Sequence, residues 1–99
     1  MPRDYPIPHP GELLREEFLI PMGITVYALA KAIHVPRSRI NEICRGNQGI
    51  TASIAVRLGK FFGTDPQWFL NMQSQYDLEN ACLDLADKLD AIQPYQTAA

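Results

Sequence analysis

Two short stretches with helical periodicity lie three residues apart, and this spacing limits the folds available to the chain more than any other feature. In residues 26–33 the apolar side chains recur at helical spacing, and Thr25 before them is a good N-cap. The tripeptide at 34–36 interrupts the pattern, with Pro36 expected at the first position of the next helix, which ends at Gly46. Two short helices joined by so tight a turn predict a helix-turn-helix pair.

The rest of the chain is also expected to be helical. Prolines at 2, 6, 8 and 10 predict an extended arm over residues 1–10, and a first helix follows, which we expect Pro21 to end. Thr51 and Asp65 are N-caps for two later helices, and no stretch reads as a strand. A chain of 99 residues then forms one compact all-α bundle of five to six helices.

Charge is distributed unevenly along the chain, although the formal net charge is only −2. Residues 31–60 carry six basic side chains and one acidic, whereas residues 61–99 carry one basic and six acidic. We therefore divide the chain into the arm over 1–10, a helix-turn-helix domain over 11–76, and a C-terminal helix with a short tail over 77–99. A basic middle and an acidic end predict two different partners.

The second helix of the pair has one apolar and one polar side. At about 100° per residue, Ile40, Ile43 and Cys44 cluster on one side of a helical wheel. The opposite side and its borders carry guanidinium, hydroxyl, amide and carboxylate groups, from Arg37, Ser38, Arg39, Asn41, Glu42 and Arg45. Such donors can reach guanine, adenine and phosphate edges in a DNA major groove. A solvated amphipathic helix in a small bundle shows the same pattern, so periodicity alone leaves both readings open.

A resemblance favours DNA binding. The segment "VYALAKAIHVPRSRINEICRG" resembles the helix-turn-helix of the phage-repressor superfamily, through Leu29, Ala30, Val35, Ile40 and Gly46. The segments "HPGELLREEFL", "RINEICRG", "ITASIAVRLGKFFGT" and "WFLNMQSQYDL" resemble the HigA-type antitoxins of bacterial toxin–antitoxin pairs. This likeness covers most of residues 9–78 and implies a λ-repressor-like fold.

The resemblance implies roles for individual residues. Arg37 and Ser38 stand where the superfamily reads bases. Arg39, Asn41 and Glu42 stand where it reads bases or holds the adjacent backbone, and Arg45 stands at a phosphate-contact position. Two positions depart from the superfamily pattern, because Pro36 replaces the usual Ser or Thr cap and Val26 replaces a glutamine that contacts phosphate. Thr25 and Tyr27 are the candidate substitutes for that contact.

The function implied by the resemblance is that of a homodimer which binds double-stranded DNA at a palindromic operator. Such a protein represses its own operon and neutralises a HigB-type toxin, a small basic mRNA endonuclease. One alternative is a stand-alone repressor of the same fold that has no toxin partner. A second alternative is a protein-interaction module whose helix-turn-helix no longer binds DNA.

Beyond residue 77 the apolar positions are spaced four, three, four and three residues apart, at Leu78, Cys82, Leu85, Leu89 and Ile92. This 3.5-residue repeat predicts a narrow seam that packs against another helix. Three arrangements fit: pairing with a second copy, folding back on the chain's own domain, or binding the toxin.

The sequence offers little chemistry for catalysis. His9 and His34 lack neighbouring ligands at metal spacing, and no phosphate-binding loop or catalytic triad is present, so we expect no enzyme activity, metal or cofactor. Cys44 and Cys82 fall among apolar positions and are expected to be two buried free thiols. No apolar run is long enough for a membrane span or a signal peptide, so we expect a cytoplasmic protein.

Overall fold

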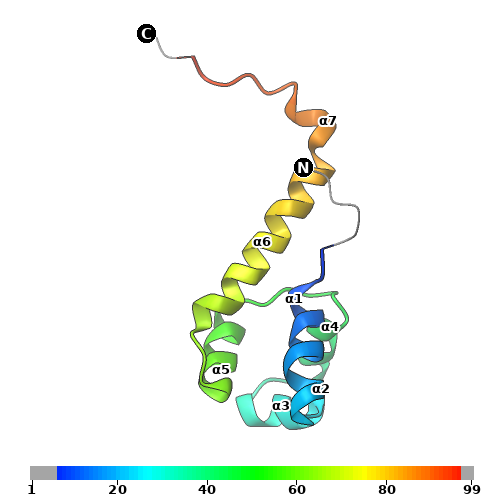
Figure 1. Ribbon diagram of the computed structural model, residues 1–99, viewed down its shortest axis with the longest axis vertical. Coiled ribbons are helices and arrows are strands. Elements are labelled where there is room, and N and C mark those ends of the chain that lie inside the picture. Colours follow the sequence, from blue (N-terminus) through cyan, green and yellow to red (C-terminus); the bar gives the residue numbers. More distant parts are fainter. Residues whose placement is uncertain (1–6, 97–99) are drawn as a thin grey trace.

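The computed structural model describes residues 7–96, and all regular structure within them is helical. The elements are α1 (Pro10–Leu13), η1 (Leu14–Leu19), α2 (Ile20–Met22), α3 (Val26–Ile33), α4 (Arg37–Cys44), α5 (Ala52–Phe62), α6 (Pro66–Asp84) and α7 (Ala86–Leu89). The expected all-α bundle with a helix-turn-helix at α3 and α4 is confirmed (Figure 1). Of the expected arm, residues 1–6 lie outside the described range, and the first helix already begins at Pro10.

The first three elements form one continuous helix, and our expectation that Pro21 ends it is wrong. The helix runs on to Met22 and ends at Gly23, whose left-handed backbone has a φ of 66°. Before the proline the helix widens into the π-helical turn η1, in which the Ile20 amide donates to the Arg15 carbonyl five residues back. In α-helical geometry the proline ring would meet the carbonyl four residues earlier, and the wider turn accommodates it.

Hydrogen bonds at both ends of α3 and at the start of α4 hold the helix-turn-helix. The Thr25 hydroxyl accepts from the Ala28 amide at 3.0 Å, as its role as the N-cap of α3 requires. His34 takes the left-handed conformation at φ 59°, and the Val35 amide donates to the Ala30 carbonyl at 3.0 Å. Pro36 is the N-cap of α4, one position earlier than expected, because its extended backbone leaves its carbonyl free to accept from the Arg39 amide.

The core lies between the first helix, α3, α4, α5 and the start of α6. Its largest fully buried side chains include Phe69, Leu14, Leu29, Ile40, Ile43 and Leu58. Trp68 and Phe61 are not part of this core, since their exposed fractions are 44% and 41%. The Trp68 ring lies on the outside of the bundle, with its edge against Phe18 and Phe69 at centroid distances of 5.6 and 5.0 Å.

The C-terminal part projects from the domain as a stalk, which gives the molecule extents of 56 × 29 × 21 Å (Figure 1). Helix α6 crosses the expected division at residues 76–77 without interruption. The helix breaks at Leu85, where φ is −100° and ψ is 3°, and α7 adds one further turn. Asp84 weakens the end of α6, since an acidic side chain is unfavourable at the negative end of a helix dipole.

The stalk corrects three expectations. The five seam residues are all exposed, so the reading in which this segment folds back on its own domain is wrong. The helix breaks at Leu85 and α7 ends at Leu89, so Ile92 lies outside these helices and the seam is not one continuous stripe. Cys82 is exposed to solvent on α6 rather than buried, whereas Cys44 is a buried free thiol as expected.

Candidate nucleic-acid interface

Helix α4 is held close against the first helix. Its apolar side is buried through Ile40, Ile43 and Cys44. On the first helix, Gly11 faces the backbone of α4 at Ile43. A Cβ atom at Gly11 would overlap the Ile43 carbonyl oxygen. Only glycine therefore permits the approach of the two backbones, which fixes the orientation of α4 in the domain.

The polar side of α4 is open to solvent. Arg37, Ser38 and Arg45 are exposed, and Arg39 and Asn41 are half-buried. The structure thus brings together on one helix the residues for which the sequence predicted base and phosphate contacts. No acidic residue lies in the first turn of α4, so the donors there face solvent without a competing carboxylate on that turn.

Two predicted residues from α3 lie next to the start of α4. The guanidinium of Arg37 lies over the ring of Tyr27, 5.9 Å from its centroid. Tyr27 is itself 55% exposed, so the pair sits at the surface. The Thr25 hydroxyl accepts the Ala28 amide but keeps its own proton to donate. The contact with the Tyr27 ring limits the conformational freedom of the Arg37 side chain before any ligand binds.

Glu42 has a partner that the sequence did not indicate. The Asn47 side-chain amide donates to the Glu42 carboxylate at 2.7 Å, and the Asn47 backbone amide donates to the Glu42 carbonyl at 2.9 Å. Gly46 between them has a φ of 82°, which turns the chain back toward α4. These bonds fix the Glu42 side chain at the end of the polar face. A five-residue separation across a turn gives no helical periodicity that would reveal the pair.

A second residue missed by sequence reasoning holds the turn of the motif. The Arg57 guanidinium on α5 donates to the Ile33 carbonyl at 2.7 Å and reaches the His34 carbonyl at 3.4 Å. These carbonyls belong to the C-terminal end of α3, where a cation is favourable. Arg57 is 23 or 24 residues from its partners, and no local pattern predicts so distant a contact.

Arg15 is a third residue that the sequence did not single out. It lines a surface cavity of about 410 Å³ together with His9, Glu12, Cys44 and Arg45. The cavity thus places a second guanidinium, from the first helix, beside the predicted phosphate contact. Burial raises the pKa of the Cys44 thiol, while the nearby Arg15 acts in the opposite direction. The thiol is therefore protonated near neutral pH and serves as a packing group.

His9 joins the first helix to α6. Its Nδ1 accepts from the Gly11 amide at 2.9 Å and so caps the helix, and its ring meets the Tyr76 ring edge-on at 4.9 Å. Burial lowers the pKa of His9, and Asp77 and Glu12 partly offset this effect. An accepting Nδ1 belongs to a neutral imidazole, which agrees with the lowered pKa.

The loop that follows α4 is held against α6 by one buried amide. The Gln73 side-chain oxygen accepts from the Ile50 amide at 2.8 Å, and its nitrogen donates to Asp77 at 3.0 Å.

Within residues 7–96, no group of three or more His, Cys, Asp or Glu side chains is placed to hold a metal ion. None of the described helices has the length and apolar character needed to cross a bilayer.

Comparison with known proteins places these features in a family. The sequence profile of the helix-turn-helix family matches residues 14–69. Virulence-associated protein I of Dichelobacter nodosus is 53% identical over 96 residues, which is 97% of this chain and 88% of the relative.

Two solved structures are similar over nearly the whole chain. The antitoxin HigA of Pseudomonas aeruginosa, solved with the higBA promoter, is 41% identical with a TM-score of 0.86 and covers 93% of this chain and 100% of that one. The antitoxin GraA, solved in complex with its operator, is 37% identical with a TM-score of 0.87, covering 99% and 98%. The chain therefore belongs to the helix-turn-helix family and, within it, to the HigA-type antitoxins.

Proposed function

We propose that this chain binds a palindromic operator as a homodimer, with α4 of each copy in a major groove, and represses its own operon in the cytoplasm. The observation that carries the proposal is the exposed polar side of α4, on which guanidinium, hydroxyl and amide groups are held by a buried opposite side. Solved relatives in complex with an operator or a promoter support the same assignment.

Each residue of the interface has a proposed role. Arg37 and Ser38 at the start of α4 read bases, and Arg39, Asn41 and Glu42 read bases or hold the adjacent backbone. Arg45 at the end of α4 contacts phosphate, with Arg15 beside it as an additional cation. Thr25 and Tyr27 on α3 supply the phosphate contacts of the bracing helix.

Two copies are needed for useful affinity. A single module with few phosphate contacts and a net charge of −2 releases few counterions and binds DNA weakly. A symmetric dimer with its two α4 helices about 34 Å apart fits successive major grooves on one side of the duplex.

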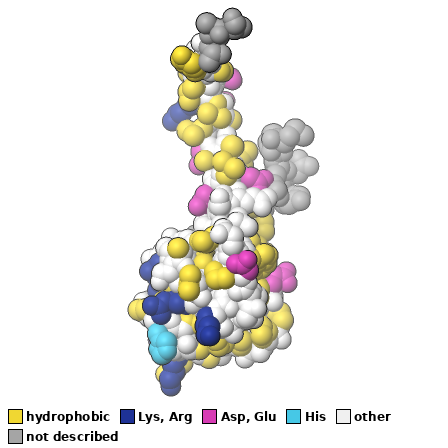
Figure 2. All heavy atoms as spheres, turned by 90° about the vertical axis from the view of Figure 1, so that its left-hand side faces the viewer, with side chains coloured by type: hydrophobic (Ala, Val, Ile, Leu, Met, Phe, Trp, Pro, Cys, Tyr) yellow, Lys and Arg dark blue, Asp and Glu magenta, His cyan; other side chains and the backbone are white. Residues whose placement is uncertain are grey.

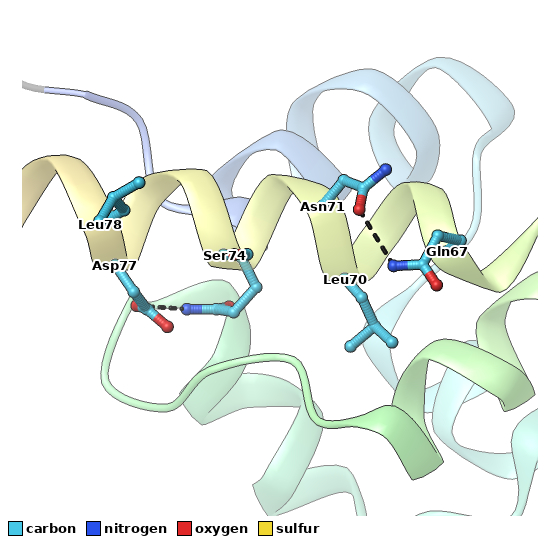
Figure 3. A pocket seen from close by; sticks show the side chains of 7 residues that line it. Gln67, Leu70, Asn71, Ser74, Asp77 and Leu78 are labelled. Atoms are coloured by element: carbon cyan, nitrogen blue, oxygen red, sulfur yellow. Dashed lines mark hydrogen bonds between the residues drawn. The ribbon is translucent and has the colours of Figure 1, made fainter.

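The dimer contact is proposed for the exposed side of α6 and the segment beyond it. This surface carries Leu78, Cys82, Leu85, Leu89 and Ile92. Nearer the domain it continues as a groove lined by Leu70, Asn71 and Ser74 (Figure 3). In that groove the Gln67 side chain donates to Asn71 at 3.0 Å, which orders the polar groups along the helix.

The DNA assignment is tested by removing two arginines separately. Arg37→Ala is expected to cost roughly 1–3 kcal/mol of operator binding and to relax preference at one base pair. Arg45→Ala is expected to weaken binding to all sequences alike and to lower the salt slope by about one unit. Lys31→Ala removes the same charge from an exposed residue outside α4 and outside the proposed dimer surfaces, and it serves as the control. Unchanged affinity in both arginine variants would contradict the groove assignment.

We further propose that the chain neutralises a HigB-type mRNA endonuclease, which its membership of the HigA-type antitoxins supports. The acidic side chains of the stalk are suited to a small basic partner, since opposite charges speed association and cover cationic groups. The test is co-expression with any short basic protein encoded next to this gene. Relief of growth arrest together with co-purification supports the proposal. If the chain does not relieve the activity of a neighbouring toxin, the toxin proposal is wrong and the chain is a stand-alone repressor.

A further inference from the structure

An apolar groove with a cationic rim lies between α3 and α5, away from the polar side of α4. Its cavity measures about 360 Å³ and is lined chiefly by Ala32, His34, Val56, Arg57, Lys60 and Phe61. We name it the α3–α5 patch. Val56 and Phe61 expose 58% and 41% of their surface, although both are apolar. In Figure 2, Lys and Arg side chains gather over the lower part of the domain, around apolar side chains and a histidine.

The end of the chain has the opposite character. Within residues 84–92, which we name the tail, the exposed apolar side chains are Leu85, Leu89 and Ile92. Three aspartates and one lysine alternate with them. The tail is thus apolar and acidic, whereas the α3–α5 patch is apolar and basic. Complementary charge around complementary apolar surface is the arrangement that gives specific association.

The break at Leu85 decides how the tail can be used. A coiled-coil seam needs one uninterrupted helix on which the apolar positions stay aligned. Here α6 ends at Asp84, α7 has four residues, and Ile92 lies beyond it. The tail is therefore a short hinged segment, suited to a groove on another surface rather than to continued pairing along α6.

The tail of a chain lies far from its own patch. Figure 1 shows α7 at the opposite end of the long axis from α3 and α5, with the continuous helix α6 between them. At about 1.5 Å per residue the 19 residues of α6 span roughly 28 Å. A straight helix of this length keeps the two surfaces apart, so the patch of a second copy is the available acceptor.

Two-fold symmetry brings the two surfaces together between copies. A two-fold axis that is perpendicular to α6 and passes near its middle sets the α6 helices of two copies antiparallel, so that the end of one lies beside the start of the other. The start of α6 adjoins α5, because Gly59 packs directly against Pro66. The tail of one copy is then delivered next to the α5 helix of its partner.

We propose that the tail of each copy docks on the α3–α5 patch of a second copy, and that this reciprocal exchange closes the homodimer. Leu85 and Leu89 fill the space beside Val56 and Phe61, while the aspartates face Lys60 and the exposed edge of Arg57. The inference rests on the proposed homodimer and names the surface that receives the tail.

The test uses charge reversal in the full-length chain, with dimer dissociation constants measured by sedimentation equilibrium. Lys60→Glu and Asp87→Lys are each expected to raise the dissociation constant roughly tenfold, because symmetry places the altered contact in the dimer twice. An equimolar mixture of the two variants is expected to form a heterodimer with nearly wild-type affinity, since every tail then meets a patch of opposite charge. Glu17→Lys, an exposed reversal outside both surfaces, serves as the control. Thermal unfolding by circular dichroism establishes that each variant is folded.

Separate outcomes overturn the inference and the proposed function. If Lys60→Glu dimerises like the wild type, the patch receives no tail, and the tail pairs with its copy or is reserved for a toxin. If both variants weaken dimerisation but the mixture does not restore it, the two surfaces do not meet. A monomeric wild-type chain that also fails to bind operator DNA would remove the proposed homodimer itself.

Discussion

At the scale of single residues, the interface is organised by a few contacts that hold functional side chains in place. Tyr27 underlies Arg37, and Asn47 fixes the Glu42 carboxylate. Helical periodicity was sufficient to place Arg37 and Glu42 on the polar side of their helix. Their partners lie on another helix or across a turn, where a sequence pattern carries no information about distance.

The Tyr27 ring is expected to contribute to operator binding through Arg37. Tyr27→Ala should weaken binding by about 0.5–1 kcal/mol, the usual value of an exposed cation–π contact. Fluorescence anisotropy with Tyr27→Ala, Arg37→Ala and the double variant measures the coupling between them. Tyr27→Phe keeps the ring but removes the hydroxyl proposed to contact phosphate, and it should lose less affinity than Tyr27→Ala. If Tyr27→Phe loses as much affinity as Tyr27→Ala, the hydroxyl rather than the ring is the contributing group.

His9 links the stability of the fold to pH. Because its folded-state pKa is lowered by burial, the unfolded chain binds the proton more readily. The contribution of neutral His9 to stability is present above the unfolded pKa of about 6.5 and is lost as pH falls through the folded pKa.

We therefore expect the free energy of unfolding to decrease as the pH falls below about 6.5, and to decrease less in the His9→Asn variant. Asparagine keeps an N-cap acceptor without titrating in this range. Urea titrations at several pH values measure both proteins. Parallel pH profiles for wild type and variant would mean that His9 contributes nothing to this dependence.

At the scale of elements, caps were the most informative signals. Thr25 and Thr51 mark the starts of α3 and α5, as the sequence predicted, and Gly63 at φ 69° ends α5. The prediction that Pro21 ends the first helix was wrong because a helix can widen by one residue per turn, and no local sequence signal indicates this. The contact of Gly11 with α4 was also invisible, since it joins positions more than 30 residues apart.

Gly11→Ala is expected to lower the free energy of unfolding by about 3 kcal/mol, because the added methyl group overlaps the Ile43 carbonyl and pushes α4 away. Gly23→Ala is a matched control, because its added methyl group meets open space. Only the positive φ of this residue is then strained, which should lower the free energy of unfolding by about 1 kcal/mol. Chemical unfolding of both variants decides the comparison. Equal losses in the two variants would show that the close approach at Gly11 is not required.

At the scale of the whole molecule, charge and shape act together. Most basic residues lie in the helix-turn-helix domain, which includes α5, and acidic residues predominate along the projecting stalk. The sequence showed this polarity and the apolar repeat, but it could not show that Cys82 and Leu85 remain exposed. Whether an apolar position is covered depends on which surface lies opposite it, and a sequence pattern does not identify that surface.

The central claim is sequence-specific DNA binding, and fluorescence anisotropy of the full-length chain on the duplex upstream of its own gene tests it most directly. A scrambled duplex is the comparison, and both are measured at two salt concentrations. We predict sub-micromolar binding to the native duplex, a clear preference over the scrambled one at each salt concentration, and two chains per operator. Equal, weak and strongly salt-dependent binding to both duplexes would contradict the claim.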